Sequence, residues 1–345
     1  MSSYSGVFDG LGLRDWCDAD AEDGPMTMAQ LLARSRGTEE AAGPWWNVPF
    51  PSLDVLHEAC GAIPRTRDLT SGLEQLFLNV RGGLQFVLDP LTDPLSWLLD
   101  GALWLFVSAP WFVLIPVILA VCYLVSRSIG LVAAVAGSLF LLAFIDHYDY
   151  AIQTLSIIFV CTMLCVAFGI PLGIAMSKSN KFQRGMLPIL DMLQTLPSFV
   201  YLIPLIFLFS VTDSKLYGIA IILYAIVPVI RLTDLGIRLV DKDVIEAADA
   251  FGMSRRQKLF QVEIPLAMPN IMAGVNQTIM MALAMVVIAS LVSAPGLGVL
   301  VLRGIRSLEL GVGLVAGLGI VILAVILDRV SKAALARINV THSNG

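Results

Sequence analysis

The stretch 245-IEAADAFGMSRRQKLFQVEIP-265 decides the fold, because it belongs to a charged segment between two apolar runs. Residues 231–263 contain 12 charged residues in 33, whereas the flanking runs 216–230 and 264–302 contain none. A helix needs about 20 apolar residues to cross a bilayer. The charged segment is therefore expected to be a loop that joins two membrane-spanning helices on one side of a membrane.

The loop is expected to contain two short helices joined by a glycine elbow. Asp243-x-x-Glu246 is typical of a helix N-cap with its capping partner, and Gly252 can end that helix. Ser254-x-x-Gln257 repeats the capping pattern. This arrangement fits a rigid knob that docks into another protein, but a surface helix on anionic lipid would look the same. The expected apolar face consists of Ile245, Ala248, Leu259 and Phe260, and the expected basic face of Arg255, Arg256 and Lys258.

Composition supports a membrane protein throughout the rest of the chain. Hydrophobic residues make up 57% and charged residues 14% of the 345 residues, against about 45–50% and 25% in soluble domains. So much apolar surface cannot be hidden in one water-facing domain, which argues against a soluble enzyme. No nucleophile, metal or acid–base constellation is visible. The net charge of −5 argues against a nucleic-acid partner, because phosphate neutralisation needs a basic face.

Uncharged runs mark about seven expected transmembrane helices in an all-α integral membrane protein. A β-barrel would need alternating polarity, which is absent. Backbone groups in lipid must satisfy one another, so the runs are expected to be helices that contact membrane lipid. The runs are 101–126, 128–145, 150–177, 192–212, 216–230, 264–302 and 310–327.

Basic residues predict the orientation. Alternate connections carry 13 Lys and Arg residues, whereas the opposite connections carry only Lys215, Arg303 and Arg306. By the positive-inside rule the first set is cytoplasmic. With seven spans, the C-terminal tail 339–345 is then cytoplasmic, and the N-terminus is periplasmic in a bacterial inner membrane.

Residues 1–100 differ from the transmembrane domain expected at 101–338. They hold 6 basic and 15 acidic residues, which favours an extracytoplasmic tail. Residues 91–107 are expected to form an interfacial amphipathic helix; if they spanned the membrane instead, the N-terminus would be cytoplasmic. Cys17 and Cys60 could pair outside the membrane, although their spacing alone cannot show it. Histidines and cysteines form no metal-binding pattern.

Four stretches of the sequence carry a family resemblance. Glu246-Ala247-Ala248, three residues, Gly252, nine residues and Val262-Glu263-Ile264-Pro265 resemble the EAA loop of ABC-importer permeases. Residues 194–204, residues 273–278 and the stretch from Met285 to Ile305 resemble the glycine betaine/proline betaine subfamily. The resemblance covers about residues 110–330, and it implies a type I importer transmembrane domain with a cytoplasmic coupling helix.

The resemblance implies the partners as well. Two copies of the permease would form the pathway, together with two cytoplasmic ATPase subunits and an extracytoplasmic substrate-binding protein. ATP and Mg would be bound by the ATPase, and no cofactor is expected in this chain, which has no P-loop. The residues expected to couple to the ATPase are Glu246, Ala247, Ala248, Gly252, Arg255 and Arg256.

Polar and aromatic residues within the expected spans are candidates for the translocation pathway: Phe199, Tyr201, Asn276, Gln277 and Thr278. Core packing explains each aromatic equally well. The substrates implied are small methylated amines, namely glycine betaine, proline betaine, choline, carnitine or trimethylamine N-oxide. One alternative is a permease for an amino acid or other small nutrient. A self-sufficient channel or secondary transporter is a further alternative, which the charge-free spans disfavour.

Overall fold

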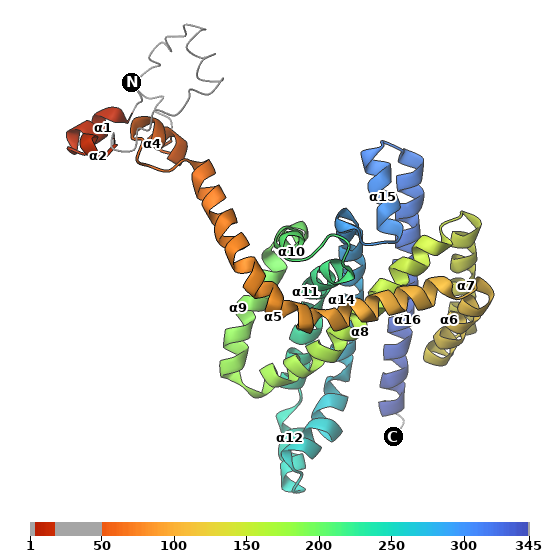
Figure 1. Cartoon of the computed structure of the whole chain (residues 1–345). Coiled ribbons are helices and arrows are strands. Elements are labelled where there is room, and N and C mark those ends of the chain that lie inside the picture. The colour runs from red at the N-terminus through yellow and green to blue at the C-terminus, as the bar shows by residue number, and fades with distance from the viewer. Residues whose placement is uncertain (1–3, 18–49, 344–345) are drawn as a thin grey trace. The chain divides into compact units, whose positions relative to one another are not determined.

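The computed structural model describes residues 4–17 and 50–343, and these form helices joined by short turns (Figure 1). The chain divides into two compact units, residues 1–83 and 84–345. Each unit is described by itself. The border expected near residue 100 lies inside a single helix, α5 (Thr66–Ser108), and the division between units falls earlier in that helix.

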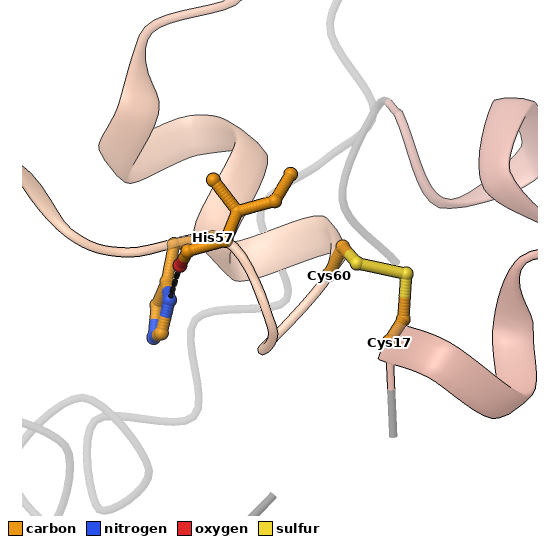
Figure 2. The surroundings of a disulfide bond; sticks show 4 residues. Cys17, His57 and Cys60 are labelled. Atoms are coloured by element: carbon orange, nitrogen blue, oxygen red, sulfur yellow. Dashed lines mark hydrogen bonds between the residues drawn. A yellow bond between two sulfur atoms is a disulfide. The ribbon is translucent and has the colours of Figure 1, made fainter. Parts of the chain in front are cut away.

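Within residues 4–17 and 50–65, the N-terminal unit has three short helices, α1 (Ser5–Gly10), α2 (Arg14–Cys17) and α4 (Leu53–Ala59), and a disulfide links the last two. Figure 2 shows the bond between Cys17, at the end of α2, and Cys60, which follows α4. Both half-cystines are buried. The His57 ring hydrogen-bonds the Ile63 backbone oxygen and holds the turn after α4. The pairing that the sequence left open is therefore formed.

The larger unit is built around three long helices that pack on one another, α8 (Tyr148–Lys178), α11 (Ser214–Arg238) and α14 (Ile264–Ala289). Glycines allow close approach. A Cβ added at Gly173 of α8 would lie 2.7 Å from the backbone oxygen of Ile230 on α11. A Cβ at Gly274 of α14 would lie 3.0 Å from Val229 Cα on α11. Backbones can come this near only where no side chain intervenes.

Helices long and apolar enough to cross a membrane number four in the described chain, or up to six if each of two bent pairs is one span. Two expected spans are therefore not single straight helices. Run 101–126 breaks at Ala109–Pro110, where α5 meets α6 at 113°, and run 192–212 breaks near Pro197 at 105°. Proline lacks a backbone donor and clashes with the preceding turn, which explains both breaks. Run 128–145 forms a shorter helix of 16 residues.

The remaining helices surround this centre. In Figure 1, α6 and α7 lie side by side, as do α15 and α16, and α12 lies at the far end of α14. The other elements are α6 (Trp111–Ser126), α7 (Ile129–Phe144), α9 (Asn180–Thr195), the 3-10 helix η1 (Ser198–Tyr201), α10 (Leu202–Leu208), α12 (Lys242–Ala250), α13 (Arg255–Lys258), the π-helix η2 (Leu259–Glu263), the 3-10 helix η3 (Ser290–Val292), α15 (Leu297–Arg306) and α16 (Leu310–Ser343).

Candidate functional site

The charged loop is shorter than expected, because helix α11 continues through its first residues to Arg238. Arg238 ends the helix with three contacts. Its Nε atom donates to Asp234 at 2.8 Å, and its terminal nitrogens donate to the Asn180 side chain and to the Met176 backbone oxygen. Gln183 donates to the other oxygen of Asp234 at 2.7 Å. This network, which the sequence analysis missed, fixes the end of α11 to the α8–α9 turn.

The N-cap of the first short helix, α12, lies two residues earlier than the sequence suggested. Asp241, and not Asp243, is the N-cap, and its side chain accepts from the Asp243 backbone nitrogen at 3.0 Å. Asp241 stands outside the helix with an extended ψ of 131°, the conformation an N-cap requires. Glu246 is therefore not the capping partner. It lies in the middle of α12 with an exposed side chain, free of ion pairs within the described residues.

The glycine elbow forms as expected. Gly252 has a φ of +74°, and the Met253 backbone nitrogen donates to the Ala248 oxygen at 3.1 Å, which closes the end of α12. A Cβ at Gly252 would meet no atom within 4 Å, so the requirement for glycine comes from the backbone.

The second short helix, α13, starts with the expected capping box. Ser254 accepts from the Gln257 backbone nitrogen at 3.3 Å, and the Gln257 side chain accepts from the Ser254 nitrogen at 2.9 Å. Lys258 then reaches back to both carboxylate oxygens of Asp249, at 2.6 and 2.7 Å. This bond joins the two helices, so the elbow has a defined angle.

The expected single apolar face of the elbow is not formed. Ile245 packs on the cluster of Ile237, Val240, Ala267 and Ile271, and Ala248 is buried. Phe260, by contrast, points outward with 65% of its surface exposed, and Phe251 is 86% exposed. One set of apolar residues seats the elbow on the helix bundle. The other set is exposed, and Phe251 is a candidate contact that the sequence pattern did not indicate.

The expected basic face lines a surface pocket. The pocket has a volume of about 440 Å³ and includes Arg255, Arg256 and Lys258, together with Lys178 from α8. Lys178 forms an ion pair with Glu263, which is buried in the π-helix between α13 and α14. This ion pair ties the elbow to the end of α8. Ala247 is exposed on α12 beside Glu246.

The five pathway candidates separate into two groups. Phe199 in η1 is 56% exposed, whereas Tyr201 is buried, donates its hydroxyl to the Leu193 backbone oxygen and packs edge-on against Tyr224. Asn276 on α14 donates to Asp328 of α16 at 3.2 Å and accepts from Ser331. The structure thus gives Asn276 and Tyr201 partners on other helices.

The last two candidates differ in burial. Gln277 is exposed. Thr278 is fully buried, and its hydroxyl has no hydrogen-bond partner among the described residues. Within the described chain, no hydrogen bond or ring contact joins the η1 group to the α14 group. Helix α14 nevertheless packs against η1, and a place for these five residues in a translocation pathway stays a prediction.

Several packed helices that are long and apolar enough to cross a membrane are typical of an integral membrane protein. Residues 166–340 match the family described as binding-protein-dependent transport system inner membrane component, which is half of the chain. The chain belongs to this family, and it is a multi-pass inner-membrane protein.

Relatives and a solved structure agree with this assignment. The chain is 41% identical over 285 residues to the glycine betaine/proline betaine transport system permease protein ProW of Escherichia coli (strain K12), covering 82% of this chain and 78% of that protein. It is 39% identical to the trimethylamine N-oxide transport system permease protein TmoV of Ruegeria pomeroyi, covering 83% of this chain and 41% of that protein. The inward-facing MetNI methionine ABC transporter matches with a TM-score of 0.51 at 18% identity, over 56% of this chain and 95% of that one. The last match concerns the fold alone.

Proposed function

We propose that this chain is the permease subunit of an ATP-driven importer of small quaternary or methylated amines. The observation that supports this proposal most strongly is the 41% identity, over 82% of the chain, to a permease named for glycine betaine and proline betaine. A second relative is named for trimethylamine N-oxide. These ligands share a small cation or dipole capped by methyl groups. The amino-acid alternative has weaker support, because the methionine transporter is similar only in fold.

The elbow is the proposed contact with the ATPase subunits. Exposed Glu246, Phe251 and Phe260 offer a carboxylate and two apolar anchors, and the Lys258–Asp249 bond keeps α12 and α13 together. Such a stiff element can transmit ATPase closure to the spans, which would shift the transporter between two states. ATP and Mg are bound by the ATPase in this proposal, and a separate extracytoplasmic protein delivers the substrate.

A second copy of this chain is the proposed partner within the membrane. Ile203 and Ile206 are 54% and 37% exposed and lie three residues apart on one face of α10, and Phe199 in the preceding 3-10 helix η1 is 56% exposed. An apolar face of this kind can bury itself against the same face of a second copy. Cysteines at Ile203 in both copies should cross-link in membranes, whereas cysteines at exposed Ile305 of α15 should not.

Uptake of labelled substrate tests the proposal directly. The chain would be expressed with its ATPase and binding protein in a host that lacks betaine transport. We expect ATP-dependent uptake of labelled glycine betaine, reduced by excess choline, carnitine, proline betaine or trimethylamine N-oxide. The strongest competitor would identify the preferred substrate. An assembled complex that takes up no methylated amine would contradict the substrate class and favour the amino-acid alternative.

A further inference from the structure

A pocket of about 430 Å³ lies where two helix corners meet, far along the chain from the elbow. One corner joins α5 to α6, and the other joins α7 to α8. Four aromatic side chains and two carboxylates line the pocket: Phe106, Trp111, Phe140, Tyr148, Asp146 and Asp149. Its volume is within the range of small-molecule sites.

The first corner places two aromatic rings at the pocket. Because Pro110 cannot continue α5, the chain turns by 113° into α6. Phe106 precedes this turn and Trp111 follows it. Phe106 packs against Phe159 with ring centroids 6.2 Å apart, and Trp111 packs edge-on against Phe112 at 6.0 Å. The Phe106 ring thus contacts a distant aromatic residue, whereas the ring contact of Trp111 is with its neighbour in the chain, and Trp111 is 59% exposed.

The second corner places the carboxylates. Asp146 has a φ of +60°, a left-handed conformation that Asp tolerates better than most residues. The backbone nitrogen of His147 donates to the Leu142 oxygen at 2.9 Å and closes the turn. Asp149 follows in the first turn of α8. A carboxylate there is favoured by the helix dipole, so its charge is stable without a cation beside it.

The electrostatics of the pocket favour a cation. No lining residue is basic. Neither Asp146 nor Asp149 forms an ion pair within the described part of the chain. Ring faces attract cations, and quaternary ammonium groups are the ligands for which aromatic sites are best suited, because methyl groups pack on rings without needing hydrogen bonds. A primary amine or metal ion would need oxygen ligands on most sides instead.

The Tyr148 side chain lines one wall of the pocket, but its hydroxyl does not open into the accessible volume of the pocket. The Tyr148 hydroxyl oxygen is enclosed and has no hydrogen-bond partner among the described residues. An enclosed donor without an acceptor costs free energy. Tyr148 therefore contributes its ring, and not its hydroxyl, to the pocket.

We propose that this corner pocket binds a methylated ammonium group through the rings of Phe106, Trp111, Phe140 and Tyr148 and the carboxylates of Asp146 and Asp149. The group is a free methylated amine or the choline headgroup of a lipid, since both present the same chemistry. Its role in import rests on the proposed function, but binding itself does not. In the proposed orientation this corner faces the outside, where substrate arrives.

Binding can be measured without transport. The full-length protein would be placed in nanodiscs of phosphatidylglycerol, and the methyl protons of choline would be observed by saturation-transfer NMR. The matched neutral ligand is 3,3-dimethylbutan-1-ol, which has the same shape without the charge. We expect transfer to choline and at least about tenfold less affinity for the neutral ligand. Nanodiscs that contain phosphatidylcholine distinguish the sources, because a lipid headgroup in the pocket would compete with choline.

Variants assign the signal to the pocket. Asp149→Asn and Trp111→Leu should each weaken choline binding by about tenfold. Asp213→Asn and Trp104→Leu are the controls, because they remove the same groups outside the pocket, and they should bind as the wild type does. Equal binding of the neutral ligand, or unchanged affinity in both pocket variants, would overturn the proposal. If the wild-type protein bound choline but its assembled complex took up no methylated amine, the result would contradict the proposed function and leave the proposed binding site standing.

Discussion

Gly173 shows how strictly one residue can be determined by its neighbours. A Cβ at this position would lie 2.6 Å from Thr233 Cβ and 2.7 Å from the Ile230 backbone oxygen. Backbone cannot move aside as a flexible side chain can. We expect Gly173→Ala to force α8 and α11 apart and to lower stability by about 1–3 kcal/mol. A lower thermal unfolding midpoint of the purified protein would measure this.

Gly185 provides the matched control for that substitution. It also lies inside a helix, α9, but a Cβ there would meet nothing within 4 Å. Gly185→Ala should leave the midpoint unchanged or raise it, because alanine favours the helix by about 1 kcal/mol. If both variants behaved alike, the close contact between α8 and α11 would be refuted.

Glu246 carries the prediction for coupling. Glu246 is exposed in the middle of α12, and Asp243 is exposed about one turn earlier, near the start of the helix. Under the proposed function, Glu246→Ala should lower substrate uptake per ATP hydrolysed by about tenfold, because a charged hydrogen bond to the ATPase is worth about 1.5–3 kcal/mol. Asp243→Ala should have little effect. Uptake and ATP hydrolysis would be measured together in proteoliposomes, and normal coupling in Glu246→Ala would rule out its docking role.

Capping shows what local sequence can and cannot predict at this scale. The Ser254–Gln257 box and the Gly252 stop were predicted, because each depends only on residues within one turn. The N-cap of α12 was assigned to Asp243 instead of Asp241, since two acidic residues compete for one cap. The Arg238–Asp234–Gln183 network was not predictable, because it joins segments more than 50 residues apart.

One buried cation contributes to the attachment of helix α5, beside the packing of Leu95 and Leu99 on Gly218 of α11. Lys215 at the start of α11 is 7% exposed and donates to Asp89 at 2.7 Å and Asp93 at 2.8 Å. Its Nζ atom also lies 5.3 Å from the centroid of the Phe209 ring. Lys215→Met should release residues 84–100 from α11 at a cost of about 1–2 kcal/mol, because two carboxylates lose their partner.

Hydrogen–deuterium exchange would measure this release. Residues 84–100 should exchange faster in Lys215→Met than in the wild type. Arg303→Met is the control, because Arg303 is 62% exposed and its pair with Glu309 spans 3.5 Å. Exposed pairs of this kind contribute little. Unchanged exchange in the Lys215 variant would show that other contacts hold α5 in place.

Helix breaks were the least predictable feature at the element scale. The charge-free runs correctly predicted α8, α11 and the apolar part of α16. The run 101–126 also predicted a single span, although Pro110 interrupts it, because the hydropathy of a sequence does not show where a helix bends. The direction of the chain after such a proline depends on tertiary packing, which a linear pattern does not contain.

The Cys17–Cys60 disulfide provides a test of topology for the whole molecule. Disulfides persist in oxidising compartments, which agrees with the proposed periplasmic N-terminus. The three other cysteines are buried, so the native protein should resist an impermeant maleimide. After treatment of intact cells with an impermeant phosphine, we expect labelling of the freed thiols.

A variant with both Cys17→Ser and Cys60→Ser should stay unlabelled under the same treatment. Labelling of the wild type only after lysis would place the N-terminal unit in the cytoplasm. That result would also support the alternative in which residues 91–107 span the membrane.

The helical stretch from Arg255 to Val292 has a mechanical consequence for the larger unit. Its 38 residues are long and apolar enough to cross a membrane. Gly274 of α14, which packs closely on Val229 of α11, lies near the midpoint and divides the stretch into two arms of similar length. At 1.5 Å per residue, each arm is about 28 Å long. Gly236 of α11 meets Asn270 and Ala267 of α14 about one turn nearer the elbow, so two glycine contacts, and not one pivot, hold α11 and α14 together. A push on the elbow would then move α14 together with α11, so that the displacement reaches the opposite end of both helices.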